Sequence, residues 1–497
     1  MKTQQFLEQH GIGANPFAEE DAQTDPVFKD FCISSTHHPT WDKVYGNPAE
    51  PATSIVFGEK GAGKTALRLQ ITRHLVLHNQ EHPTARVFVI EYDDFNPFLD
   101  RFRDRFGARH RSAGKLLGDW KLWDHMDAIL TLGVTGLVDR ILESRHTNDP
   151  PTNALDGAPL GALDRHQARD LLVLAACYDQ STAETSKGRW RRLRRKLHFH
   201  SWPALWQLAL GIVGTVAVAA LLVYLQAWHW LETPWPYVAA GAAWLPWLAK
   251  FASRFWRAAT VARNLRIGKH SANQLRQILM NFRSSDIVGQ PLPSKQRTDD
   301  RYELLAKFQG ILDTLGFRGI VVLVDRVDEP HMINGSVEQM RALLWPMLDN
   351  KFLKHPGIGF KLLLPIELSQ FIEREDRDFY QRARLDKQNL IPSLEWTGEA
   401  LFDVASARIK ACALPGRAPA LRDLFDDSID DRRLTSAFRG LRVPRHLFKF
   451  MYRLFVAHCN AYTDDAPCWK ISSERFESVL ALYGRDQDAF DKGLRAG

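Results

Sequence analysis

The chain has 497 residues, which is long for one domain, so we expect two or more structural units. Hydrophobic residues make up 45% of the chain and charged residues 25%, which are ordinary values for a globular protein. The five cysteines are scattered without a C-x-x-C pair, which argues against a zinc site, and the net charge of +7 is compatible either with a nucleic-acid partner or with basic segments beside a membrane.

Residues 1–50 are expected to form an irregular, polar N-terminal segment. This segment contains the adjacent histidines His37 and His38, which raise the question of a metal site. Because neighbouring residues on one loop rarely converge on one ion, a solvated loop is the favoured interpretation, with metal binding as the alternative.

The most specific motif of the chain lies in residues 51–97, which we interpret as the first part of a nucleotide-binding core. Gly58 to Thr65 fits the phosphate-loop pattern G-x-x-x-x-G-K-[ST] at every constrained position. A buried-strand pattern precedes the motif, and Leu67, Ile71 and Leu75 follow it at helical spacing. Because both flanks are correct, a chance match in a glycine-containing turn is disfavoured.

This motif predicts that the chain binds ATP together with Mg²⁺. The backbone N–H groups of a glycine loop can surround phosphate oxygens, and the helix N-terminus adds a partial positive charge. Lys64 is expected to reach the β- and γ-phosphates, and the Thr65 hydroxyl is expected to bind Mg²⁺. The N-terminal segment, residues 1–50, is expected to pack beside the nucleotide base. The residues expected to hold the nucleotide are Gly58, Glu59, Lys60, Gly61, Ala62, Gly63, Lys64, Thr65 and Ala66.

The next part of the chain predicts the fold class. A second buried strand is expected at 85–90, and the alternation of strands with helices indicates an α/β fold. In such a fold the sheet is parallel and helices cover both of its faces. Residues 98–188 have a mostly helical pattern and are interpreted as an insertion into this core.

Residues 189–266 differ in composition from the rest of the chain. No Lys, Arg, Asp or Glu lies between Leu197 and Leu231, and 203–225 are almost wholly apolar, long enough to cross the ~30 Å hydrocarbon core of a bilayer. A second uncharged run, 233–249, is shorter and contains three prolines. The basic residues that flank the two runs are Arg189, Arg191, Arg192, Arg194, Arg195, Lys196, Lys250, Arg254, Arg257, Arg263 and Arg266.

The positions of these basic residues predict a transmembrane hairpin. They lie on both outer sides of the apolar pair, whereas the link at 226–232 carries neither Lys nor Arg. Both ends of the hairpin are therefore expected in the cytoplasm, with the basic flanks against anionic lipid. The alternative, a hairpin buried in a protein core, is disfavoured for the first run and stays open for the second.

Residues 267–398 are expected to complete the core, and 399–497 to form a C-terminal helical lid. An apolar strand pattern at 320–324 ends at Asp325, which is the form of a Walker B motif. Burial of such a strand fixes its terminal carboxylate, so Asp325 is expected to hold Mg²⁺ opposite Thr65.

The phosphate loop, the apolar hairpin before the Walker B strand and the late run Val443-Pro444-Arg445 resemble the KAP-type P-loop NTPases, which belong with the STAND and AAA-like ATPases. The resemblance implies an ATPase core with a helical lid, and Lys64, Thr65 and Asp325 match the motif residues of the family. It also implies that Arg445 is the lid arginine that contacts the γ-phosphate. An ordinary arginine at the start of a helix is the alternative.

The chain departs from this family at Arg326, where KAP proteins tend to carry a second acidic residue. The run from Asp325 to Glu329 is closer to the NACHT-like form D-x-h-D-E. Asp328 or Glu329 is therefore the candidate that polarises the attacking water.

The expected function is that of a conformational switch. The resemblance implies a multi-pass protein of the inner membrane, whose cytoplasmic ATPase domain acts in bacterial signalling or anti-phage defence. A protein partner or effector at the membrane is expected, and a homo-oligomer is compatible with the family. The alternative is a nucleic-acid-dependent ATPase tethered at the membrane, which the net charge of +7 favours slightly.

Overall fold

The computed structural model describes residues 1–34, 36–106, 113–142, 155, 160–182, 184–200, 206–226 and 228–491. They form two compact units. Unit 1 comprises Met1–Glu81, Leu323–Asp328 and Asp349–Gly497, and unit 2 comprises His82–Val322 and Glu329–Leu348.

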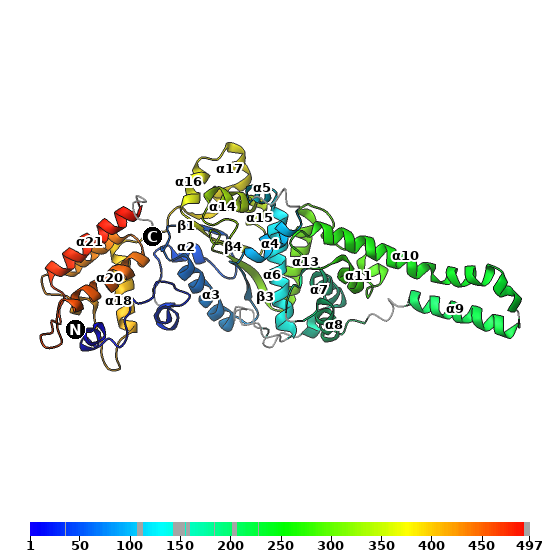
Figure 1. Cartoon of the computed structure of the whole chain (residues 1–497), viewed down its shortest axis with the longest axis horizontal. Helices are drawn as coiled ribbons and strands as arrows, with labels where there is room; N and C mark the ends of the chain where they lie inside the picture. Colours follow the sequence, from blue (N-terminus) through cyan, green and yellow to red (C-terminus); the bar gives the residue numbers. More distant parts are fainter. Residues whose placement is uncertain are drawn as a thin grey trace. The chain divides into compact units, whose positions relative to one another are not determined.

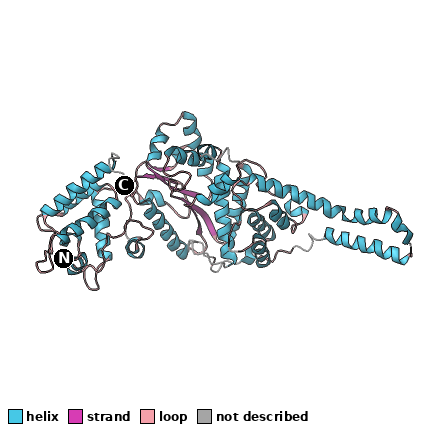
Figure 2. Ribbon diagram, in the orientation of Figure 1, coloured by secondary structure: helices cyan, strands magenta, loops and turns pink. Residues whose placement is uncertain are grey.

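One sheet of five parallel strands supports the fold, as Figure 2 shows in magenta. The strand order is β2-β3-β4-β1-β5, and Ser54 of β1 pairs with Lys361 of β4 on one side and with Asn389 of β5 on the other. Every residue of β1 and of β4 is buried, as expected for parallel strands covered on both faces. The predicted α/β fold with a parallel sheet is therefore confirmed. The strands are β1 Ser54–Gly58, β2 Arg86–Tyr92, β3 Phe317–Val324, β4 Ile358–Pro365 and β5 Asn389–Ile391.

Unit 1 joins the two ends of the chain in one apolar core. Phe6 from the N-terminal helix is buried with Leu447 and Phe455 of the C-terminal helices. The segment 1–50, which we expected to be irregular, thus contains helices that pack on the C-terminal part. The helices of unit 1 are α1 Thr3–Gln9, α2 Trp41–Tyr45, α3 Lys64–Glu81, α15 Asn350–Leu353, α16 Glu367–Glu373, α17 Arg377–Ala383, α18 Gly398–Ala411, α19 Asp431–Leu441, α20 Pro444–Asn460 and α21 Ser473–Asp491, with short turns at Phe28–Cys32, Leu385–Lys387 and Leu421–Leu424.

Unit 2 is mainly helical. Its central helix, α6, is buried along almost its whole length and packs against α7, α8 and α13. The helices of unit 2 are α4 Asn96–Asp104, α5 Ala113–Gly118, α6 Leu122–Leu142, α7 Arg165–Tyr178, α8 Ser186–Lys196, α9 Trp206–Tyr224, α10 Trp235–Asn264, α11 Ala272–Leu279, α12 Ser284–Ile287, α13 Asp299–Thr314 and α14 Val337–Leu344, with short turns at Leu160–Ala162, Trp228–Glu232 and Trp345–Met347.

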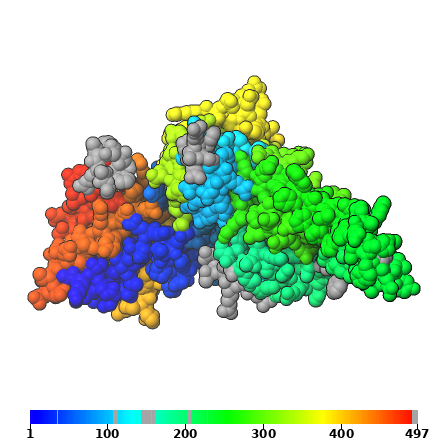
Figure 3. All heavy atoms as spheres, turned by 45° about the vertical axis from the view of Figure 1, so that its right-hand side comes forward, coloured from blue at the N-terminus to red at the C-terminus, as the bar shows by residue number. Residues whose placement is uncertain are grey.

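Helices α9 and α10 form a hairpin that extends from the rest of unit 2 (Figure 1; green in Figure 3). A Cβ atom at Gly214 would lie 2.5 Å from the Cβ atom of Ala243, so small residues allow the two helices to approach closely. Their outer faces are apolar and exposed: Val213 is 64% exposed and Leu245 is 62% exposed.

Within the described part of the chain, α9 alone is long and apolar enough to cross a membrane, judged by its length and composition. The first residues of the predicted run 203–225, which are 203–205, lie outside the described residues. The second predicted run, which lies in α10, does not meet the same criterion. A second membrane-crossing helix is therefore not supported.

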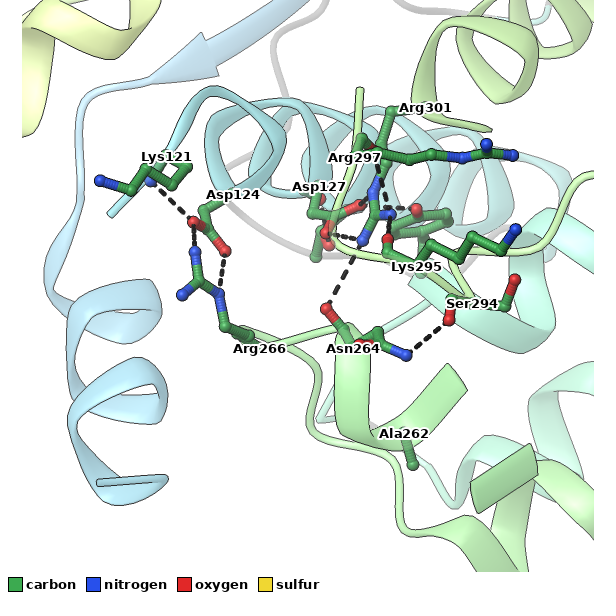
Figure 4. A network of polar contacts seen from close by, with 12 residues as sticks. Lys121, Asp124, Asp127, Ala262, Asn264, Arg266, Ser294, Lys295, Arg297 and Arg301 are labelled. Carbon is green, nitrogen blue, oxygen red and sulfur yellow. Dashed lines mark hydrogen bonds and ion pairs between the residues drawn. The ribbon is translucent and has the colours of Figure 1, made fainter. Parts of the chain in front are cut away.

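Buried ion pairs connect the end of α10 and the residues just after it to α6 and α13 (Figure 4). The guanidinium of Arg301 on α13 donates to both carboxylate oxygens of Asp127 on α6, at 3.1 and 3.0 Å, and both side chains are fully buried. Arg301 also donates to the carbonyl of Asn264, the last residue of α10, at 3.5 Å. Next to this pair, Arg266 donates to both oxygens of Asp124.

The Asp127–Arg301 pair gives a test of this packing. Asp127→Asn leaves the Arg301 guanidinium buried without its counter-charge, so we expect the free energy of unfolding to fall by about 3–5 kcal/mol in urea denaturation. The matched control is Asp313→Asn, which removes a partner of Arg318 at 3.0 Å from a pair that is more than half exposed. The control should change the free energy by less than about 1 kcal/mol, and equal losses would contradict the proposed role of burial.

His125 gives a second test, through pH. Its Nδ1 atom lies 3.1 Å from the Tyr92 hydroxyl and its Nε2 atom 2.7 Å from the Leu343 carbonyl, which suits a neutral ring that donates from Nε2. Burial lowers the pKa of His125 from 6.5 to about 4. Because the folded pKa lies below the unfolded one, this group stabilises the fold fully above pH 6.5, and the contribution is lost as the pH falls to about 4.

The lost contribution amounts to about 3 kcal/mol at the acid end of this window. His125→Gln keeps a donor for the Leu343 carbonyl but does not titrate. The difference in unfolding free energy between the parent chain and this variant should therefore shrink as the pH is lowered from 6.5 to 4. A difference that is constant with pH would show that His125 is not held neutral.

Candidate functional site

The phosphate-loop motif forms a tight turn between β1 and α3 in unit 1. β1 ends at Gly58 and α3 begins at Lys64. Gly61 and Gly63 both have φ angles of +92°, a conformation that side chains with a Cβ atom adopt only with strain. The sequence therefore places glycine where the loop needs it, and the first N–H groups of α3 lie at the end of the loop, where a helix can bind an anion.

Lys64 folds back over this loop. Its Nζ atom donates to the carbonyls of Gly58 at 2.8 Å and Glu59 at 3.0 Å. Burial lowers the pKa of Lys64, while the nearby carboxylates of Asp325, Asp328 and Glu367 act in the opposite direction. The ammonium group is thus held above the glycine loop by neutral acceptors that a phosphate group can replace.

Thr65 and Asp325, which the sequence predicts as the Mg²⁺ ligands, lie side by side. The Thr65 hydroxyl donates to Oδ2 of Asp325 at 3.1 Å, and Asp325 is buried directly after the end of β3. A hydroxyl and a carboxylate oxygen are hard ligands of the kind that Mg²⁺ prefers. The described residues contain no group of three or more His, Cys, Asp or Glu that could hold a metal ion, so any ion here would need further ligands, as in sites where Mg²⁺ also binds phosphate and water.

Arg68 is a site residue that the sequence analysis missed. It lies on α3 one turn after Thr65, is only 2% exposed, and its Nε atom is 3.5 Å from Oδ2 of Asp325. Burial raises the pKa of Asp325, and the Arg68 guanidinium is the first of the groups that oppose this rise. In the sequence Arg68 directly follows Leu67, the first residue of the predicted buried helix face that also contains Ile71 and Leu75. This position next to a buried face is the signal that could have identified it.

The residues after Asp325 turn sharply. Arg326 has a φ angle of +57°, which is rare for a residue other than glycine, and its guanidinium donates to Oε1 of Gln23 at 2.5 Å. Asp328 is partly buried and acts on the Lys64 ammonium, so it belongs to the same site. Glu329 is exposed and is the first residue of the following stretch of unit 2. The structure thus brings Asp328 to the loop within unit 1.

The C-terminal helices contact the loop directly. Pro444 and Arg445 begin α20, and the backbone N–H of Arg445 donates to the Gly61 carbonyl at 3.4 Å. The Arg445 guanidinium faces Glu20, with 3.9 Å between Nε and Oε2, and its charge also lowers the pKa of Lys64. Arg445 therefore lies at the glycine loop, as a lid arginine would.

Trp396 also contacts the glycine loop. Its Nε1 atom donates to the Ala62 carbonyl at 2.9 Å, and the ring of His38 packs on it edge-on at 4.7 Å. His38 is 5% exposed and contacts the Glu395 carbonyl at 2.8 Å, whereas the His37 ring turns to His74, with 2.9 Å between their Nε2 atoms. The interpretation of a solvated loop is therefore wrong for His38, and the adjacent histidines face different partners.

The other predicted loop residues are placed simply. Glu59 and Lys60 are exposed, whereas Ala62 is fully buried and Ala66 lies within the first turns of α3.

Comparison of the chain with protein families, with characterised proteins and with solved structures finds no match. The resemblance to KAP-type ATPases therefore stays a hypothesis that rests on the motifs and on the geometry of the loop.

Gly61 gives a test of the loop that does not depend on any ligand. A Cβ atom there would lie 2.6 Å from the Cβ atom of Arg445, in addition to the strain of the positive φ angle. Gly416, in the same unit, has a φ angle of +78° but open space around it. Gly61→Ala should therefore lower the free energy of unfolding by about 1–3 kcal/mol more than Gly416→Ala. Equal losses in denaturant melts would show that α20 does not lie against the loop.

Proposed function

We propose that the chain is a Mg²⁺-dependent ATPase whose catalytic site is the glycine loop of unit 1. The observation that carries this proposal is the 3.1 Å hydrogen bond between Thr65 and Asp325, directly beside Lys64. These side chains lie 260 positions apart in the sequence and come from different elements, and their proximity supports a shared role as metal ligands. The N-terminus of α3, the buried carboxylate of Asp325 and the Lys64 side chain together suit a nucleoside triphosphate with its metal ion.

Each residue has a role in this proposal. The loop N–H groups and Lys64 bind the phosphates, and Thr65 and Asp325 hold the metal ion, which would neutralise developing charge on the phosphate oxygens. Asp328 is the favoured residue to orient and polarise the attacking water, with Glu329 as the alternative. Arg68 stabilises the ionised form of the Asp325 carboxylate, because burial of a carboxylate without a counter-charge is energetically unfavourable.

We further propose that the C-terminal helices respond to the nucleotide. Arg445 and Trp396 both hydrogen-bond to the glycine loop, so a change in the loop is passed directly to α20. This supports a conformational switch, as the resemblance to KAP-type ATPases implies, with a role in bacterial signalling or anti-phage defence. A protein partner at the membrane would receive the change.

The proposed anchor is the α9–α10 hairpin. Its exposed apolar side chains would be unfavourable in water over so large an area, which supports contact with lipid. We propose attachment at the inner membrane through α9, with unit 1 in the cytoplasm. Recovery of the chain in the soluble fraction, unchanged when α9 is deleted, would contradict this anchoring.

The assay that tests the proposal is steady-state ATP hydrolysis by the full chain in detergent. Lys64→Ala should lower the turnover at least about a hundredfold, because the lysine stabilises charge that develops in the transition state. Lys410→Ala, an exposed lysine at the end of α18, is the matched control and should not change it. Turnover that survives Lys64→Ala would place any ATPase activity outside this loop.

Further arms of this assay separate the alternatives. Asp328→Ala should lower turnover about 10²–10⁴-fold if Asp328 polarises the water, and Glu329→Ala should do so if Glu329 has this role. Adding DNA or RNA tests the alternative function. Strong stimulation that Lys64→Ala abolishes would favour a nucleic-acid-dependent ATPase over a switch.

A further inference from the structure

Two basic residues in the second half of α10 are buried. The buried residues in this half of the helix are Lys250, Arg254, Ala258 and Val261, spaced as one helical face. Arg254 is 2% exposed. An apolar residue would be expected at such a position, so the burial of Arg254 needs a specific explanation.

More cations surround them on neighbouring segments of unit 2. Arg254 donates to the Arg283 carbonyl at 3.3 Å, and Arg257 donates to the Ile287 carbonyl at 3.5 Å. Arg276 on α11 stacks over the ring of Phe251 at 4.3 Å. We call the set Arg254, Arg257, Arg276 and Arg283 the hairpin-base cluster.

The charge of the hairpin-base cluster is poorly compensated. The carboxylate that acts on Arg254 is that of Asp286, which already accepts from the backbone N–H of Arg283 at 3.1 Å and pairs with Arg165 at 3.6 Å. The Nε atoms of Arg254, Arg276 and Arg283 are buried and donate no hydrogen bond. Burial and repulsion from Arg257 both lower the pKa of Arg254. The cluster thus holds like charges together, and the Asp286 carboxylate that acts on Arg254 also has other partners.

The basic residues of α8 show the contrast. Arg189 is buried between the carboxylates of Asp139 and Asp179, at 2.6 and 3.0 Å, and Arg192 pairs with Glu184. Basic residues in this unit therefore receive acidic partners where the fold uses them as structural ion pairs.

We propose that the hairpin-base cluster is a binding site for a phosphate group. Arginine is suited to this ligand because its planar guanidinium presents paired donors to phosphate oxygens. The cluster begins directly after the apolar half of α10, at the level where a bilayer that surrounds α9 would place its headgroups. An anionic phospholipid and a soluble phosphate share this chemistry. The site is separate from the glycine loop and does not require ATP hydrolysis.

The test measures binding by calorimetry with the full chain carrying Lys64→Ala, so that the glycine loop does not take up the added phosphate. The chain is titrated with detergent micelles that contain phosphatidic acid, with micelles that contain phosphatidylcholine, and with inorganic phosphate alone. In this background Arg257→Gln and Arg276→Gln should each weaken binding of phosphatidic acid roughly tenfold. These two residues are partly exposed, so the variants are expected to fold.

The matched control is Arg195→Gln, which removes the same charge from an exposed position on α8. Binding that is weakened equally by the control and by the cluster variants would overturn the proposal, because it would show attraction to net charge only. Absence of binding in all titrations would also overturn it. Preference for phosphatidic acid would assign the site to a lipid headgroup, whereas saturation by inorganic phosphate without a lipid preference would assign it to a soluble phosphate.

Discussion

The buried carboxylate of Asp325 joins the end of β3 to the start of α3, through the hydroxyl of Thr65 and the guanidinium of Arg68. Burial disfavours its charged form, and these two groups oppose that effect. The arrangement leaves a negative charge at the carboxyl end of a central strand, where open α/β sheets place their ligands. A divalent cation would compensate this charge more fully than the 3.5 Å contact with Arg68 does.

The glycine loop between β1 and α3 is also in contact with residues from the C-terminal part of the chain. Arg445 occupies the space that the missing side chain of Gly61 leaves, and Trp396 bonds to the next residue, Ala62. A loop with these contacts cannot change its conformation without moving Arg445 and Trp396. Closely packed segments tend to shift between two discrete arrangements and do not deform gradually. This is the physical basis for our proposal of a switch, and not only a binding site, in unit 1.

Charge has different uses in the two units. In unit 1 Lys64, Arg68 and Arg445 lie around the Asp325 carboxylate and the glycine loop. In unit 2 Arg301 and Arg266 neutralise buried carboxylates of α6 and so hold the segment that follows the hairpin. The arginines of the hairpin-base cluster lie on and beside the helix that ends at this network, and the carboxylate that acts on Arg254, that of Asp286, also contacts Arg165. The excess positive charge of the chain is therefore concentrated in part at one defined place, beside the most apolar segment of the sequence.

The sequence by itself determined the parallel α/β sheet, the glycine loop and the pairing of Thr65 with Asp325, because each depends on a local pattern of strand, turn and helix. It also located the apolar hairpin, since an uncharged run of this length is visible without any contact. Only the tertiary structure decided the roles of Arg68, His38 and the inward-facing cations of α10. Their surroundings come from segments far apart in the chain, and no local periodicity records whether a charged side chain will meet a carboxylate, a carbonyl or another cation.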